Sequence, residues 1–179
     1  MNRLPIIGVV GSHVDSHAEL AAPLGQLIAE SGCHLLTGGG GGVMTSVAKS
    51  FTENSTRKGV CIGIVPIEDA QEIKKLPHYT NPYIEIPIIT QLSQRVIDSA
   101  AMPMAHNEVN ILSSDLIVGL PGFKGTQAET SKALAFDKPI VLFGNPKEFV
   151  HFPSDIMVAE GIEEVGQFML KIFNARKKL

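Results

Sequence analysis

Thr126 and Glu129 are the residues whose spacing points most directly to chemistry, because they follow a glycine-bearing turn and stand three positions apart. This pattern predicts a capping box, in which Thr126 caps a helix and the Glu129 carboxylate bonds back to the N–H group of the cap. The same carboxylate would lie on the rim of a binding site. There it could hold a ribose hydroxyl or handle a water molecule, and the spacing favours neither role over the other.

Few other side chains combine a reactive type with a suggestive position. His106 follows Pro103 at the predicted start of a helix, although a lone histidine is more often a surface or packing residue. His13 follows the first predicted strand and is expected on the binding rim. Ser12 lacks the G-x-S-x-G pattern of a hydrolase nucleophile, and no cluster of histidines, cysteines and carboxylates predicts a metal site. Lys124 is a candidate phosphate contact.

Three short turns rich in small residues follow apolar segments, at residues 11–13, 37–44 and 121–126. The second holds five consecutive glycines, Gly38 to Gly42, although glycine loses more backbone freedom on folding than any other residue. Two of the turns lead directly into a predicted helix, whose first N–H groups are unpaired and attract anions. Since glycines let the backbone approach a phosphate closely, these turns predict a phosphorylated ligand.

Neither glycine turn matches a standard nucleotide fingerprint. The dinucleotide pattern G-x-G-x-x-G belongs after the first strand, whereas the glycine run follows the second. A P-loop needs Gly-Lys followed by Ser or Thr, whereas the order here is Lys124, Gly125, Thr126. A tight strand-to-helix connection would explain either turn alone, but two such turns on one rim favour an anionic ligand.

Apolar strand segments alternate with amphipathic helices along the chain, which predicts how the turns are positioned. The strand segments are apolar on both faces, as in a parallel sheet covered by helices on both sides. Strands are predicted at residues 5–11, 33–37, 60–66, 115–120 and 139–144, with an extended segment at 83–89. Helices are predicted at residues 17–32, 43–54, 91–102, 105–114, 127–136 and 161–178. We therefore expect an α/β fold, a single Rossmann-like three-layer domain over residues 1–179 with a mostly parallel sheet.

The composition is that of a globular protein, with 44% hydrophobic and 18% charged residues. The formal net charge of −3 and the pI near 6.1 disfavour a nucleic-acid partner. Cys33 and Cys61 lie in apolar segments without metal-binding spacing, which predicts buried, reduced thiols in a cytoplasmic protein. We expect no membrane partner, because the chain lacks a signal-peptide pattern and no apolar run reaches the ~20 residues of a membrane span.

The two glycine turns together resemble those of the LONELY GUY (LOG) and molybdenum-cofactor-carrier superfamily. The family pattern is a strand followed by G-G-G-x-x-G-x-M and, later, a strand ending in P-G-G-x-G-T-x-x-E. Residues 38–44 match the first part, and the second part is matched by Pro121, Gly122, Gly125, Thr126 and Glu129. The likeness runs over most of the chain and is specific for the superfamily rather than for one of its branches.

The resemblance implies two functions. LOG-type members are phosphoribohydrolases, which split nucleoside 5′-monophosphates into base and ribose 5-phosphate, and Glu129 matches their motif glutamate. Carrier-like members imply binding of molybdenum cofactor, a phosphorylated pterin. The family's arginine before the "SD" strand is His106 here, and the neighbouring Asn107 matches the carrier-like branch, so both positions favour a carrier. Arg95 on the preceding predicted helix is a candidate substitute for that arginine in an enzyme.

Phe123 replaces the middle glycine of the family's P-G-G turn. Phenylalanine disfavours positive φ, and its ring would block a close approach of ligand to backbone. We therefore hypothesise that Phe123 lies over a base or a pterin ring.

The resulting expectation is a binding protein for a nucleotide or a pterin phosphate, with no required cofactor beyond a possible bound nucleotide or molybdenum cofactor. A LOG-type phosphoribohydrolase is the alternative, and a DNA-binding role, which the fold also supports elsewhere, is disfavoured by the acidic charge. The expected catalytic residues are Glu129 and His106. The expected ligand-binding residues are Gly11, Ser12, Gly38, Gly39, Gly40, Gly41, Gly42, Met44, Asn107, Pro121, Gly122, Phe123, Lys124, Gly125 and Thr126.

The resemblance also implies self-association, as a dimer or a tetramer. The segments expected at the interface are residues 91–101 and the helix that begins at His106, with Met102 and Met104 between them.

Overall fold

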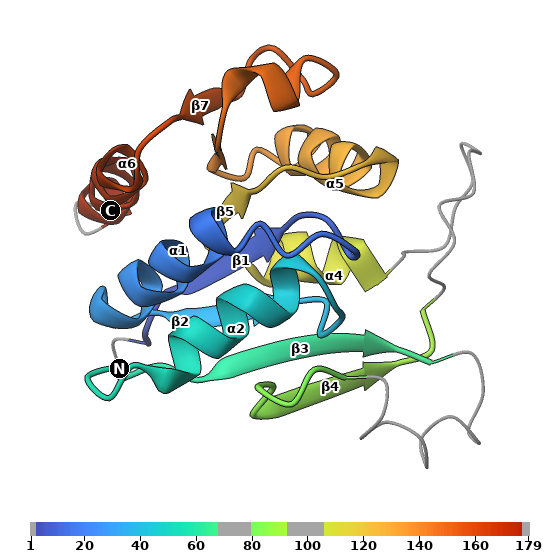
Figure 1. Ribbon diagram of the computed structural model, residues 1–179, viewed down its shortest axis with the longest axis vertical. Coiled ribbons are helices and arrows are strands. Elements are labelled where there is room, and N and C mark those ends of the chain that lie inside the picture. Colours follow the sequence, from blue (N-terminus) through green and yellow to red (C-terminus); the bar gives the residue numbers. More distant parts are fainter. Residues whose placement is uncertain (1–2, 68–79, 93–105, 177–179) are drawn as a thin grey trace.

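Seven parallel strands form one sheet in the computed structural model, which describes residues 3–67, 80–92 and 106–176 (Figure 1). Their order across the sheet is β4-β3-β2-β1-β5-β6-β7. The strands are β1 (Ile6–Val10), β2 (His34–Thr37), β3 (Cys61–Pro66), β4 (Ile86–Thr90), β5 (Leu116–Gly119), β6 (Ile140–Phe143) and β7 (Met157–Ala159). The predicted α/β fold with a parallel sheet is confirmed.

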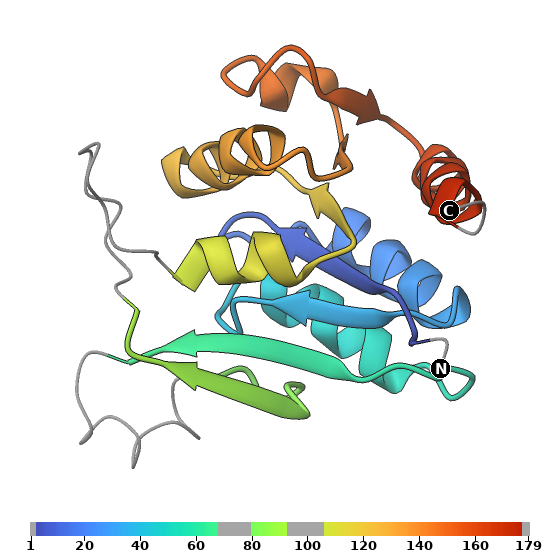
Figure 2. The same ribbon diagram turned by 180° about the vertical axis from the view of Figure 1, so that it is seen from behind.

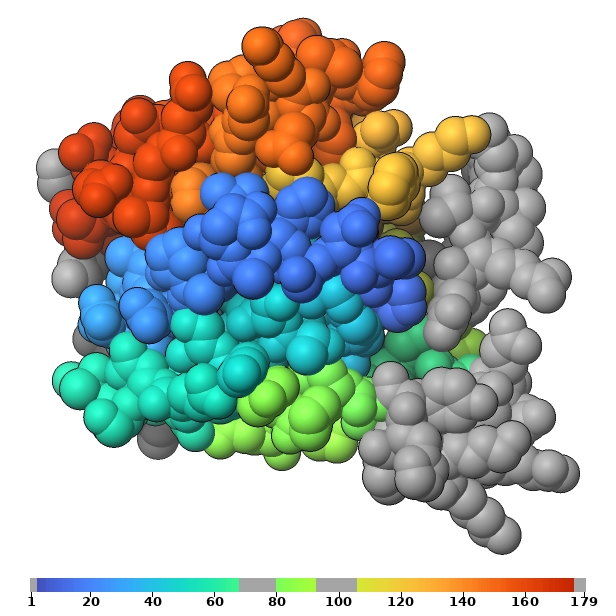
Figure 3. Space-filling view, in the orientation of Figure 1, coloured from blue at the N-terminus to red at the C-terminus, as the bar shows by residue number. Residues whose placement is uncertain are grey.

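Helices cover both faces of this sheet, as the front and back views show (Figures 1 and 2). One face carries α1 (Ala18–Glu30), α2 (Val43–Glu53) and α6 (Ile162–Arg176), and the other carries α4 (His106–Ser113) and α5 (Lys124–Ala135). A 3₁₀ helix covers residues Pro146–Phe149. The space-filling view shows α1 and α2 lying side by side across the front of the molecule (Figure 3).

The apolar core is divided by the sheet into two clusters. On the side of α1 and α2, Leu24 and Phe51 are fully buried against the sheet. On the side of α4 and α5, Ile111 and Ala133 pack with Ile117 of β5. Because strands with helices on both faces must be apolar on both faces, the continuous apolar runs of the sequence are accounted for.

Most elements begin and end within a few residues of their predicted positions, and the differences have local causes. Strand β7 was not predicted, because three residues are too few to show a periodic pattern. Helix α5 begins at Lys124, earlier than predicted. The predicted helix over 91–102 and the residues Met102 and Met104 fall almost entirely outside the described residues.

Cys33 and Cys61 are free, buried thiols, as predicted. Burial raises the pKa of each thiol to about 12, so neither is a reactive thiolate near neutral pH. No helix in the described part of the chain is long and apolar enough to cross a membrane.

Candidate functional site

The order of the strands places a crevice between β1 and β5. From β1 the chain passes to α1 on one face of the sheet, and from β5 it passes to α5 on the opposite face. Beyond these two strands the chain therefore continues toward opposite faces of the sheet, and ligands of open α/β sheets bind at such a point. A cavity of about 590 Å³ lies here, at the carboxyl ends of the strands.

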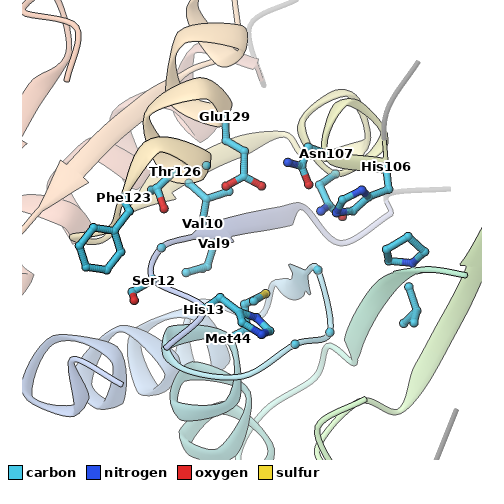
Figure 4. Close-up of a pocket in the computed structure, with 18 of the residues that line it drawn as sticks. Val9, Val10, Ser12, His13, Met44, His106, Asn107, Phe123, Thr126 and Glu129 are labelled. Atoms are coloured by element: carbon cyan, nitrogen blue, oxygen red, sulfur yellow. The ribbon is translucent and has the colours of Figure 1, made fainter. Parts of the chain in front are cut away.

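Most of the residues predicted from the sequence line this cavity (Figure 4). They are Gly11, Ser12, Gly38, Gly39, Gly40, Met44, His106, Asn107, Phe123, Gly125, Thr126 and Glu129. The other predicted residues belong to the same turns without lining the cavity: Gly41, Gly42, Pro121, Gly122 and Lys124. The tertiary structure thus brings turns that are distant in sequence to one place.

Backbone hydrogen bonds join the three turns into one unit. The N–H group of Ser12 donates to the carbonyl oxygen of Pro121 at 3.0 Å, which joins the turn after β1 to the turn after β5. The carbonyl oxygen of Ser12 accepts from the N–H group of Val43 at 2.9 Å, which joins the same turn to the start of α2. The rim of the cavity is therefore held by backbone atoms of the turns themselves.

The hydroxyl of Ser12 serves its own turn. It accepts hydrogen bonds from the N–H groups of Val14 and Asp15 at 3.2 and 2.9 Å, and it lies 3.2 Å from a carboxylate oxygen of Asp15. A side chain so engaged shapes the turn through an ST-type motif. Ser12 thus contributes backbone and shape to the rim.

The glycine run packs against the turn after β1, which explains part of its composition. Gly42 is the N-cap of α2 and has φ 59°. A Cβ atom on Gly42 would overlap with the carbonyl oxygen of Ser12, and one on Gly40 would lie 2.9 Å from the ring of His13. Gly42 is therefore required where one turn crosses another, whether or not a ligand is bound, whereas the atoms nearest a Cβ on Gly40 belong to the side chains of His13 and Met44, which can shift.

The N-terminus of α2 is only partly open toward the cavity. The N–H group of Val43 donates to the carbonyl oxygen of Ser12, and the N–H group of Met44 lies 3.2 Å from the carbonyl oxygen of Gly41.

Asn81 holds the glycine run in place, since its backbone N–H group donates to the carbonyl oxygen of Gly39 at 2.9 Å. Its side-chain nitrogen donates to the carbonyl oxygen of Gly40 at 3.1 Å.

The capping box predicted for Thr126 and Glu129 does not form at the start of α5. Its N-cap is Phe123, without a side-chain hydrogen bond, and Thr126 lies inside the first turn of the helix rather than before it. The reason is that the helix begins within the glycine turn itself. Phe123 has φ −96°, so the turn does not require positive φ at this position. The backbone of the turn therefore accommodates phenylalanine, although this residue disfavours positive φ.

Because Glu129 does not cap the helix, its carboxyl group is available to the cavity, into which it points from α5 (Figure 4). Burial raises the pKa of this half-buried carboxyl to about 7, and the nearby Lys132 opposes the shift. The Lys132 ammonium is itself bound to the Glu108 carboxylate of α4 at 2.7 Å. Glu129 is therefore placed to exchange a proton near neutral pH.

His106 and Asn107 lie at the start of α4, at the end of the cavity away from Phe123 (Figure 4). Phe123 is 68% exposed as a residue and lies beside Ser12 and Thr126, at the opposite end. Among the described residues, neither lysine nor arginine lines the cavity, and Arg95 lies outside the described residues. The described residues also contain no group of three or more histidine, cysteine or carboxylate side chains that could hold a metal ion.

Sequence reasoning missed Asn110, which lines the cavity from the second turn of α4. The signal was its spacing, since residues three and four positions after Asn107 and His106 share a helix face with them. His13 lines the cavity, as its position after β1 suggested. The residues at the end of β3, Val65 to Ile67, also line it and were not named, because an apolar strand end carries no chemical signal.

Asp115, in the "SD" motif before β5, binds the N-terminal segment and does not line the cavity. Both carboxylate oxygens of Asp115 bind the Arg3 guanidinium, at 2.7 and 2.8 Å, and one of them accepts the N–H group of Ile6 at 2.8 Å. Asp115 thus holds the N-terminal segment against the start of β5, at the amino ends of the strands, whereas the cavity lies at their carboxyl ends.

Comparison with known proteins gives a consistent picture. The model of the SLOG cluster4 family matches residues 4–165. The molybdenum cofactor carrier protein of Chlamydomonas reinhardtii has a similar structure, with TM-score 0.72 and 28% identity over 96% of this chain and 99% of that chain. The molybdenum cofactor binding protein of Rippkaea orientalis is similar with TM-score 0.70 and 27% identity, covering 98% of each chain. An uncharacterized protein of Archaeoglobus fulgidus is 29% identical in an alignment of 164 residues that covers 84% of this chain and 95% of the relative.

Proposed function

Because the chain belongs to the SLOG cluster4 family, within the superfamily that includes molybdenum cofactor carriers, we propose that its cavity binds a phosphorylated small molecule. The proposed ligand is a nucleotide or a pterin phosphate such as molybdenum cofactor. Its phosphate lies at the first turn of α5, and its ring system lies deeper in the cavity.

The observation that carries this proposal is Gly125. It occupies the first turn of α5 and lines the cavity, and a Cβ atom there would meet no other atom within 4 Å. Glycine inside a helix costs roughly 1 kcal/mol relative to alanine. Since nothing in the fold requires the missing side chain, the bare backbone is best explained by a ligand that approaches it. The first N–H groups of a helix and its dipole suit a phosphate at that place.

The remaining wall of the cavity suits a ring. Val9, Val10 and Met44 give it an apolar part, and Thr126 and Asn107 add polar groups. The volume of about 590 Å³ falls within the ~300–1,000 Å³ usual for small-molecule sites. The two proteins of similar structure, a molybdenum cofactor carrier protein and a molybdenum cofactor binding protein, support the same class of ligand.

Glu129 favours a second candidate function, the LOG-type phosphoribohydrolase. A carboxylate beside a bound nucleoside 5′-monophosphate would stabilise the oxocarbenium-like transition state while water attacks the sugar carbon. The Glu129 carboxyl lies in the cavity, and its pKa of about 7 leaves a substantial carboxylate fraction at neutral pH. His106 stands where the family places an arginine, so substrate contacts in this enzyme would differ from those of its relatives.

A cytoplasmic location and self-association as a dimer or tetramer stay predictions. Of the segments expected at the interface, residues 93–101 lie outside the described residues. Helix α4, the other segment, exposes Leu112.

The proposal is tested by calorimetric titration of the purified protein with GMP, AMP and the matching nucleosides. We expect the 5′-monophosphates to bind at least about tenfold more tightly than the nucleosides, because only they carry the group for which α5 is suited. Equal affinity for nucleotide and nucleoside would contradict a phosphate site. In the same samples, release of free base and ribose 5-phosphate would identify the enzyme, and binding without release would identify a binding protein.

A further inference from the structure

Asn110 has a polar atom that the folded chain leaves unsatisfied. Its side chain is buried, with 6% of the residue exposed, and the oxygen Oδ1 is a buried side-chain atom without a hydrogen-bond partner among the described residues. Leaving such an atom unpaired costs roughly 1–3 kcal/mol, and buried polar atoms are nearly always paired. Other buried polar side chains nearby do have partners, such as Ser12 in its turn and Thr37 on the N–H group of Gly39.

The position of Asn110 indicates where a partner would come from. Asn110 lines the cavity one helical turn beyond His106 and Asn107. Its amide nitrogen lies near the glycine run, since a Cβ atom on Gly38 would be 3.7 Å from Nδ2. The amide therefore belongs to the wall between α4 and the turn after β2, whereas Gly125 belongs to the wall formed by α5. Because Oδ1 itself exposes essentially no surface, it meets a ligand only after the amide group rotates about its Cβ–Cγ bond, which exchanges the places of oxygen and nitrogen and leaves the size of the side chain unchanged.

The chemistry of the amide oxygen restricts the group that can satisfy it. An amide oxygen only accepts hydrogen bonds, and a phosphate dianion presents only acceptors, so a phosphate cannot pair with it. A ring N–H or amino group can. The apolar side chains of Val9, Val10 and Met44 line the same cavity, which suits a flat ring that carries such a donor on its edge.

We infer that Asn110 selects the ring of the ligand by accepting a hydrogen bond from a ring N–H or amino group. This inference rests on the proposed function and adds an orientation to it. The phosphate lies at α5, and the donor edge of the ring faces α4. A ligand whose ring presents a lactam edge, with adjacent N–H and carbonyl groups as in guanine or a pterin, would use both the oxygen and the nitrogen of the amide.

The test compares GMP with ribose 5-phosphate on wild-type protein and on Asn110→Leu. Leucine has a similar size but offers no hydrogen bond. We expect Asn110→Leu to weaken GMP binding about tenfold and to leave ribose 5-phosphate binding unchanged, because the sugar phosphate lacks the ring. We also expect the melting temperature of the ligand-free variant to rise by about 2–4 °C, since an unpaired buried polar atom is removed.

Phe123→Ala tests the alternative position of the ring, because Phe123 lies at the end of the cavity away from His106 and Asn107, which begin the helix that carries Asn110 (Figure 4). A loss of GMP affinity in Phe123→Ala, with unchanged affinity in Asn110→Leu, would overturn the inference and place the ring under Phe123. If both variants bound GMP like wild type, the inference would also fail. If wild-type protein bound neither GMP nor ribose 5-phosphate, the proposed function itself would fail.

Discussion

Gly42→Ala is expected to lower the melting temperature by roughly 10 °C. Gly42 combines φ 59° with ψ −128°, a conformation that is essentially restricted to glycine. Its Cβ atom would overlap with the carbonyl oxygen of Ser12 and lie 2.8 Å from that of Asp15. Both clashes involve backbone, so a side-chain rotation cannot relieve them. Differential scanning calorimetry measures the change.

Gly125→Ala is the matched control, because it adds the same methyl group to the other glycine turn. The Cβ atom would meet nothing within 4 Å, and alanine favours the helix by up to about 1 kcal/mol, so stability should stay the same or rise. Affinity for ribose 5-phosphate should nevertheless fall about tenfold or more, since the methyl group occupies the place of the phosphate. A Gly125→Ala protein that binds like wild type would remove the main support for a phosphate at α5.

Glu129→Gln is expected to raise the melting temperature at pH 8 and to leave it nearly unchanged at pH 4. The pKa of Glu129 is raised from 4.5 to about 7 in the folded protein, mainly by burial. Between pH 4.5 and pH 7, Glu129 is mostly deprotonated in the unfolded chain but mostly protonated in the folded protein. The free energy of unfolding therefore decreases as the pH rises through this range, and the loss is complete above pH 7. Glutamine carries no charge, so the Glu129→Gln protein does not lose stability in this way. For a half-buried side chain the gain is roughly 2 kcal/mol at pH 8, or about 4–8 °C.

Ligand binding should follow the same titration. A bound phosphate would favour protonated Glu129, so wild-type affinity for GMP should fall by up to about tenfold per pH unit above pH 7, whereas Glu129→Gln should show a flat profile. The phosphate itself is already dianionic there, since its second pKa is about 6. The other groups nearby are Lys132, which is bound to Glu108, and the imidazoles of His13 and His106 on the cavity wall. Parallel pH profiles for the two proteins would show that a group other than Glu129 causes the pH dependence.

The pH profile also separates the two candidate functions. A phosphoribohydrolase needs Glu129 as a carboxylate, so base release should increase as the pH rises through about 7 and should fall at least about 100-fold in Glu129→Gln. A binding protein should show only the loss of affinity with rising pH. Base release that survives in Glu129→Gln would show that another group performs the chemistry.

Several features of the site were predictable because they depend on local sequence. Apolar runs ending in glycine predicted the strands and the turns after them, and parallel strands then required the turns to share one edge of the sheet. The position of Glu129 on that edge followed from its place early in a helix. The capping-box prediction was wrong because α5 begins at Lys124, inside the glycine turn, which places Thr126 in the first turn of the helix rather than at its N-cap.

The amino-acid sequence alone thus determined the class of fold, the edge of the sheet that holds the site and most of the residues around the cavity. Periodic patterns and turn residues encode these locally. Only the tertiary structure showed that Gly42 serves the fold while Gly125 lies open, that burial shifts the pKa of Glu129, and that the amide oxygen of Asn110 lacks a partner. Each of these depends on which distant atoms surround the residue, because steric room, desolvation and hydrogen-bond pairing are properties of the packed chain.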